Sequence, residues 1–235
     1  MRVMPRIGSS VVVSVAALAV LGMTAVPASA ATTVTKAQAR AIAAKINFTA
    51  ADFPGYHVTP YKPTASDRAE NARLQKCIGG APDLVDVSAA EFDNPTTGDG
   101  YSSETSFVAS PAAVKKDASR IVSTHAQQCI KQEFAVGVNQ EGGSKTKVSL
   151  SPINEPSVSG LNAVFGYRLA ITTTIGGHRL TLHGYLLGFG RGNAEVSFTE
   201  FGPGTVSESS TNSLVATLAD RAKHEVPASG FTIKG

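Results

Sequence analysis

The 235-residue sequence contains no tryptophan, only two cysteines and few aromatic residues, which make up 6% of the chain. Two cysteines far apart in the chain form neither a C-x-x-C redox pair nor the four-ligand cluster of a structural zinc site. After the first thirty residues, no apolar run approaches the roughly 18 residues that a membrane-spanning helix needs. We therefore expect no metal, no cofactor and no stable membrane insertion of the main domain.

The first thirty residues are strongly patterned, as in a secretory signal peptide. Arg2 and Arg6 form a positive start, residues 11–22 are almost wholly apolar, and residues 27–30 (Pro-Ala-Ser-Ala) supply the small residues of a cleavage site. We expect the mature, extracellular chain to begin near Ala31. Retention of this segment as an N-terminal anchor is the alternative. No cysteine directly follows the apolar segment, so a lipid-modified N-terminus lacks its acceptor thiol.

Most of the net charge of +3 belongs to this leader. Without Arg2 and Arg6, 19 basic residues face 18 acidic ones, which leaves a net charge of +1. A nearly neutral chain gives no electrostatic reason to expect a nucleic acid or an anionic lipid as partner. The length of residues 31–235 suits a single secreted domain, which we expect to be soluble and monomeric.

The two cysteines, Cys77 and Cys129, are predicted to form a disulfide. In an oxidising compartment an isolated pair of cysteines is most simply paired in this way. Closing the loop between them would stabilise the fold by about 4 kcal/mol, because the cross-link restricts the unfolded chain. Free thiols or an intermolecular disulfide are the alternatives.

Caps and apolar periodicity predict four helices: residues 36–46, 64–79, 110–134 and 207–224. Thr35 can cap the first helix, and Thr64 with Asp67 has the spacing of a capping box at the start of the second. The third helix is the longest, because one apolar stripe runs along its whole length. Cys129 lies on that stripe, so a disulfide would tie this helix to the end of the second one.

Alternating apolar residues predict five strands: residues 101–109, 145–153, 164–175, 178–189 and 195–201. Gly176-Gly177 joins two of them as a two-residue hairpin, which places Tyr167 opposite Leu186. A three-residue loop containing Gly192 is then predicted, since it puts Val196 and Phe198 beside Leu186. The expected fold is α+β, a mainly antiparallel β-meander packed against the long central helix, with N- and C-terminal helices added.

The hairpin register also brings polar residues together on one face. Arg168 and Tyr185 lie opposite each other, and His183 shares their face, so we assign these three as a candidate ligand-binding patch. The alternative is an ordinary solvated or helix-covered sheet face. His178 points to the opposite face and cannot share a metal with His183 without a bulge. His125 borders the apolar stripe of the long helix and is a further candidate, or else a partly buried helix residue.

No catalytic residue is assigned. The G-x-S-x-G elbow is absent, and the one S-x-x-K match, Ser144 to Lys147, begins a predicted strand instead of lying on a helix. The glycines of residues 188–192 connect strand to strand, so they indicate a hairpin and not a phosphate loop.

Residues 81–100 are irregular, and the acidic stretch from Cys77 to Val114 has no basic residue. Within it, the oxygen ligands of residues 93–100 lack the spacing of a calcium loop, which favours a solvated loop there.

The order of elements resembles a broad group of exported actinobacterial proteins. The resemblance rests on the Asp52-Phe53-Pro54-Gly55-Tyr56 element, a Cys at a helix end, a Ser-rich strand over residues 101–110, and Cys129-Ile130 in a long helix. Some members of the group are similar to extracytoplasmic sensor domains of serine/threonine kinases. Those domains typically carry two disulfides and a transmembrane tether, whereas this chain has one cysteine pair and no tether.

The resemblance implies a protein without assigned enzymatic activity that binds ligands or cell-envelope components. We therefore expect a secreted, non-catalytic binding or sensor-like domain for a small ligand, a lipid or an envelope component. The concave surface between the sheet and the long helix is the expected site. The alternatives are an exported hydrolase with a noncontiguous site, and a structural interaction protein of the cell surface recognised by an exposed apolar patch.

Overall fold

The computed structural model describes residues 32–79, 83–153, 158–204 and 206–234. The predicted signal peptide and its cleavage site before Ala31 lie outside the described residues. Over the described ranges, no helix has both the length and the apolar character that crossing a membrane requires.

The described chain is built around one antiparallel sheet of eight strands, in the order β2-β4-β5-β9-β8-β7-β6, with β3 paired to β5. The strands are β2 (His57–Thr59), β3 (Val85–Ser88), β4 (Glu91–Asp93), β5 (Gly100–Phe107), β6 (Ser144–Pro152), β7 (Ala163–Ile175), β8 (His178–Arg191) and β9 (Ala194–Gly202). A separate parallel pair joins the two ends of the domain, β1 (Thr33–Thr35) and β10 (Thr232–Lys234).

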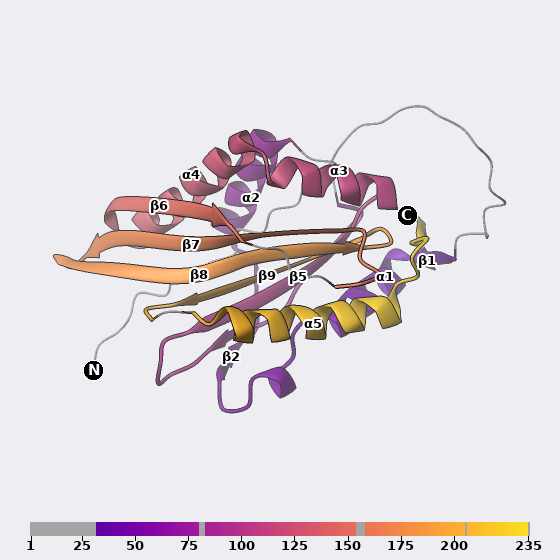
Figure 1. Cartoon of the computed structure of the whole chain (residues 1–235), viewed down its shortest axis with the longest axis horizontal. Helices are drawn as coiled ribbons and strands as arrows, with labels where there is room; N and C mark the ends of the chain where they lie inside the picture. Colours follow the sequence, from indigo (N-terminus) through magenta and orange to yellow (C-terminus); the bar gives the residue numbers. More distant parts are fainter. Residues whose placement is uncertain (1–31, 80–82, 154–157, 205, 235) are drawn as a thin grey trace.

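Helices cover both faces of the sheet, which confirms the α+β prediction (Figure 1). On one face lie α1 (Lys36–Ile46) and α5 (Glu208–Glu225), with the short 3-10 turn η1 (Ala50–Asp52) following α1. On the other face lie α3 (Pro111–Ile121) and α4 (Thr124–Gln140), and α2 (Ala65–Ile78) packs against α4. The sheet is therefore the middle layer of three.

The predicted helix starts are confirmed by their caps. Thr35 accepts a hydrogen bond from the backbone N–H of Gln38, and the Gln38 side chain accepts one from the N–H of Thr35. Thr64 and Asp67 form the same capping box at the start of α2. Gly79 ends α2 with a φ of 72°, a backbone conformation that glycine adopts without strain.

The long helix expected over residues 110–134 is two helices, and its end was also placed too early. The first ends at Ile121, and the hydroxyl of Ser123 accepts a hydrogen bond from the N–H of Ala126, which starts α4 anew. A serine side chain that bonds the backbone in this way competes with the continuing helix. The apolar stripe nevertheless runs across the break, because Ile121 and Ile130 enter the same core.

The β7–β8 hairpin has the predicted register, with Tyr167 opposite Leu186. The next connection was predicted wrongly, because it is a two-residue turn of Gly192 and Asn193 and not a three-residue loop. Val196 lies opposite Phe189, so its side chain is on the other face of the sheet from Leu186. Gly192 does take the expected left-handed conformation, with a φ of 55°.

The error has a physical reason: both faces of β8 are buried. Leu187 and Phe189 point into the core beneath α1 and α5, whereas Leu182 and Leu186 point into the core beneath α2 and α4. The sequence interpretation assumed one buried face, and a three-residue loop was the choice that kept all apolar residues on it. The region over residues 81–100 also holds two short strands, β3 and β4, where none was predicted.

Candidate functional site

Two residues of the predicted patch, Arg168 and Tyr185, are brought together by the hairpin register. The guanidinium carbon of Arg168 lies 5.6 Å from the centre of the Tyr185 ring. Its Nη2 donates to the Tyr185 hydroxyl and to Oε2 of Glu208, both at 3.3 Å. Tyr185 is only 2% exposed, whereas Arg168 is exposed. The first residue of α5, Glu208, therefore takes up part of the charge that a ligand would otherwise meet.

His183 shares this face but not this cluster. Its register partners are Ala170 on β7 and Gly202 on β9, and its own side chain is exposed. Among the described contacts, Arg168 and Tyr185 bond each other without it. The ligand-binding role of the three residues stays a prediction.

The same row of side chains continues across the sheet to a buried carboxyl that the sequence analysis missed. Glu200 lies opposite Tyr185 and Tyr101, and it is 3% exposed. Thr211 of α5 donates to its Oε2 at 2.8 Å, and Tyr101 also hydrogen-bonds to it. Burial raises the pKa of Glu200, and burial together with this carboxyl raises that of Tyr101. The wrong loop length had placed Glu200 on the opposite face, which concealed this row.

On the other face of the sheet, beneath α3, three carboxyl groups line a small pocket that we call the acid pocket, and the carboxyl of Asp86 contacts one of them, Glu104. The cross-strand register brings the strand residues together, since Asp86 and Glu195 both lie opposite Ser106. Asp117 reaches in from α3. The cavity volume is about 30 Å³. Its polar lining is Glu104, Ser106, Asp117, Glu195 and Ser197, and its apolar lining includes Val114, Ala118, Ile121 and Phe165. Asp86 lies at its edge and is exposed.

Asp117 and Glu195 form the most unusual contact of the pocket. Asp117 is 2% exposed, and among the described residues neither of its carboxylate oxygens receives a hydrogen bond from an N–H group or from a serine, threonine or tyrosine hydroxyl. Arg120 is its nearest ion-pair partner, with 3.8 Å between Nη1 and Oδ1. The carboxyl group of Glu195 meets it within hydrogen-bonding reach. Two carboxyl groups can bond in this way only when one is protonated, so the pair shares a proton.

The pKa shifts support this assignment. Burial, and to a lesser degree the negative charge of Asp83, raises the pKa of Asp117 to about 7 against the attraction of Arg120. Burial and the negative charge of Asp117 raise the pKa of Glu195 well above its usual range. Glu195 therefore holds its proton more tightly than Asp117, and Asp117 accepts the hydrogen bond as a carboxylate above about pH 7.

Glu104 and Asp86 form a second acid pair at the edge of the pocket. Glu104 is 4% exposed, and Ser88 donates to its Oε2 at 2.6 Å. Burial and the nearby charge of Asp86 raise the pKa of Glu104 well above its usual range. Desolvation also raises the pKa of Asp86, and a hydrogen bond links the two carboxyls. The acids in and beside the pocket thus form two pairs, and bound protons neutralise part of their negative charge.

A sequence signal for this site existed. Asp117 follows Val114 by three residues and precedes Ile121 by four, so it lies on the buried side of the stripe. An acid at a stripe position is rarely buried without a partner. Glu104 lies on β5, as predicted for the strand over residues 101–109, whereas Asp86 lies on β3 in the region over residues 81–100 that was predicted to be irregular.

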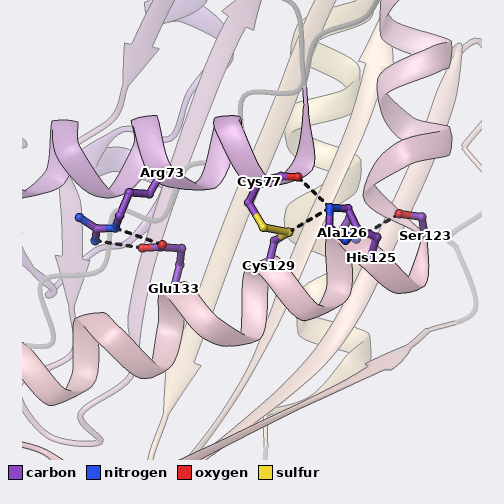
Figure 2. Close-up of a disulfide and its surroundings, with 7 residues drawn as sticks. All are labelled: Arg73, Cys77, Ser123, His125, Ala126, Cys129 and Glu133. Carbon is purple, nitrogen blue, oxygen red and sulfur yellow. Dashed lines mark hydrogen bonds and ion pairs between the residues drawn. A yellow bond between two sulfur atoms is a disulfide. The ribbon is translucent and has the colours of Figure 1, made fainter.

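The predicted disulfide between Cys77 and Cys129 is present and joins α2 to α4 (Figure 2). His125 stands one turn before Cys129, and its Nε2 lies 2.9 Å from the carbonyl oxygen of Cys77 and 3.8 Å from Cys129 Sγ. A carbonyl can only accept, so Nε2 carries a proton here. The His125 side chain is exposed and not partly buried as expected. Its role in ligand binding stays a prediction.

The same two helices are held together by an ion pair about one turn from the disulfide. Arg73 of α2 donates to both carboxylate oxygens of Glu133 on α4, at 3.2 and 3.1 Å (Figure 2). This two-bond geometry fixes the relative position of the helices more firmly than a single contact does.

The described residues show little of a hydrolase site. No hydrogen bond among them joins a serine to a histidine. His224 lies 3.2 Å from a carboxylate oxygen of Glu225, its chain neighbour, but both stand at the end of α5 and His224 is exposed. Ser144 bonds the backbone of Thr174, as expected for a strand residue.

No protein-family model matches this chain, and no curated protein matches its sequence. Among solved structures, an uncharacterised protein of Mycobacterium smegmatis is similar, with a TM-score of 0.39 and 13% identity over 77% of this chain and 96% of that one. The extracellular domain of PknH from Mycobacterium tuberculosis is similar with a TM-score of 0.34 and 7% identity, over 69% of this chain and 98% of that one. The predicted likeness to sensor-like domains is thus confirmed as a weak likeness of architecture. At these TM-scores it carries nothing about function.

Proposed function

We propose that residues 31–235 form a single exported domain that performs no catalysis and binds a small ligand in the acid pocket. The observation that carries this proposal is the carboxylate of Asp117, whose two oxygens are buried in the pocket and whose one hydrogen-bonding contact among the described residues is another acid, Glu195. A buried carboxylate oxygen that is left without a hydrogen bond destabilises the fold by roughly 1–3 kcal/mol. A binding role explains why the chain keeps such a group.

The chemistry of the pocket favours a ligand with a primary ammonium group. Ionised carboxylates only accept hydrogen bonds, so Asp117 and Glu195 fit a group that donates several. A cavity of this volume accepts one small group, about the size of one or two water molecules. An ammonium can therefore enter while the rest of the ligand stays at the mouth. Amino acids, amino sugars and some lipid headgroups of the cell envelope carry this group.

Proton exchange balances the charge. In the empty pocket, the proton shared by Asp117 and Glu195 neutralises one of their two charges. An entering ammonium brings its own positive charge, so Glu195 can release its proton to solvent. Both carboxylates then accept hydrogen bonds from the same cation.

Binding is supported better than either alternative function. The pocket has no room for a substrate bond together with an attacking water, and no histidine lines it. In the part of the chain that the structure describes, the exposed large apolar side chains come from four separate segments, which is ordinary for a protein surface: Val58, Leu84, Val122 and Val136. The Arg168, Tyr185 and His183 patch stays a separate prediction, since Glu208 already binds Arg168.

Thermal unfolding with a matched pair of probes tests the proposal. We expect n-propylammonium chloride to raise the melting temperature in a saturable way, while 1-propanol and sodium chloride at equal concentration do not. Asp117→Asn should remove the rise, because the pocket then lacks its ionised acceptor. Asp93→Asn, at an exposed acid of β4, is the matched control and should keep it. No rise with the amine, or an equal rise in Asp117→Asn, would overturn the proposal.

A further inference from the structure

Around the disulfide, three potential metal ligands converge from two helices. One ligand atom each from Cys77, His125 and Cys129 lies within 4.8 Å of the other two. His125 and Cys129 are four residues apart on α4, so both side chains project from the same side of that helix. Cys77 faces them from the end of α2 (Figure 2). We infer that, when the disulfide is reduced, these three side chains form a zinc site. The disulfide and the bound metal are then alternative states of the same three residues.

The geometry suits tetrahedral zinc. Zinc binds thiolate sulfur at about 2.3 Å and imidazole nitrogen at about 2.0 Å, so the two ligand atoms stand about 3.5 Å apart in a tetrahedral site. Nε2 of His125 lies 3.8 Å from Sγ of Cys129. Two thiolates and an imidazole are also the ligand types that zinc prefers over harder cations. Three protein ligands leave the fourth position to water.

Metal ions can reach these three side chains from solvent. Cys129 is 2% exposed, but Cys77 is only partly buried and His125 is exposed. The carbonyl of Cys77 already orients the imidazole toward the sulfurs. To bind the metal through Nε2, His125 must give up its hydrogen bond to the Cys77 carbonyl. Its ring proton then sits on Nδ1.

The two helices have contacts that keep the ligands close without the disulfide. Arg73 and Glu133 bond twice across them, and Leu74 and Ile130 are fully buried between α2, α4 and the sheet. Arg120 donates to the carbonyl of Gly79 at 2.7 Å, which fixes the end of α2 beside Cys77. Reduction therefore frees the sulfurs while their helices stay packed.

Reduction of the disulfide is a thiol–disulfide exchange with a small dithiol. A small dithiol reduces the disulfide to two thiols and is itself oxidised to a cyclic disulfide. A newly made chain that has not yet been oxidised holds the same two thiols. Zinc then replaces the two thiol protons, which pass to solvent. In the reverse exchange the two thiolates re-form the protein disulfide, the cyclic disulfide of the small dithiol takes up the two electrons and two protons to become the dithiol, and the metal is released.

Cobalt(II) is the probe, because thiolate ligands give it an ultraviolet charge-transfer band and tetrahedral geometry gives it visible bands. The purified protein is reduced with a phosphine, desalted without oxygen and titrated with Co²⁺. We expect both sets of bands at a 1:1 ratio, their loss on adding Zn²⁺, and none in the oxidised protein. The carboxyls of the acid pocket cannot produce the charge-transfer band, so this result is independent of the proposed ammonium binding.

His125→Gln should weaken Co²⁺ binding by at least about tenfold, since even residues that merely support a metal ligand have effects of 10–100-fold. His178→Gln, at an exposed histidine of β8, is the matched control and should bind as the unchanged protein does. Absence of the charge-transfer band, or equal affinity in the two variants, overturns the inference. If the reduced protein loses its helical circular dichroism, Zn²⁺ should restore it, and failure to do so overturns the inference as well.

Discussion

At the scale of single residues, the pocket rests on acids whose burial is unusual. Asp117 stands on the buried stripe of α3, and its carboxyl contacts the carboxyl of Glu195. The position of Asp117 could be predicted from its spacing to Val114 and Ile121. Its contact with Glu195 could not, because that contact depends on which face of β9 turns toward α3.

The raised pKa of Asp117 predicts how stability depends on pH. The ordinary pKa is 3.8 and that of the folded state is about 7, so the folded state holds the proton more tightly. This contribution to stability is fully present below about pH 4 and is lost as the pH rises through about 7. An asparagine cannot ionise, so Asp117→Asn removes the loss.

We expect Asp117→Asn to be more stable than the unchanged protein at pH 8, on the order of 1–2 kcal/mol after discounting for partial solvent screening, with a much smaller difference at pH 4.5. Urea unfolding at the two pH values measures this. Asp93→Asn should show no such pH-dependent gain. A variant that is equally or less stable at pH 8 would contradict the shared-proton assignment.

At the scale of elements, local signals predicted where helices start better than where they stop. Thr35 and Thr64 were identified as caps, but Ser123 was not, because a continuous apolar stripe concealed the new start. The break matters for the pocket, since it lets α3 carry Asp117 over the sheet while α4 carries Cys129 to α2.

We expect Ser123→Ala to destabilise the protein by about 1 kcal/mol, because the N–H of Ala126 loses its acceptor. Ser119→Ala is the matched control in α3, where the serine hydroxyl only donates to the carbonyl of Lys115. That change should stay within about 0.5 kcal/mol. Urea unfolding of both variants distinguishes them, and equal losses would show that the cap does not hold the start of α4.

At the scale of the whole molecule, the fold class, the β7–β8 register and the disulfide could be predicted, because each depends on a local or pairwise signal. The three-layer arrangement could not. It requires that β8 be apolar on both faces, with Leu187 toward α5 and Leu186 toward α4, and a single alternating pattern does not distinguish two cores from one. The position of the pocket follows from that arrangement, since a sheet with one covered face would leave Glu195 in water.

Calorimetric titration of the protein with n-propylammonium at pH 8, where Asp117 is mostly ionised, in buffers of different ionisation enthalpy, tests the central claim most directly. The slope of the observed heat against the buffer ionisation enthalpy counts the protons released on binding. If the cation replaces the proton shared by Asp117 and Glu195, about one proton should leave for each amine bound, and none should leave in Asp117→Asn. Binding without proton release, or no binding at all, would contradict the assignment of the acid pocket as the ligand site.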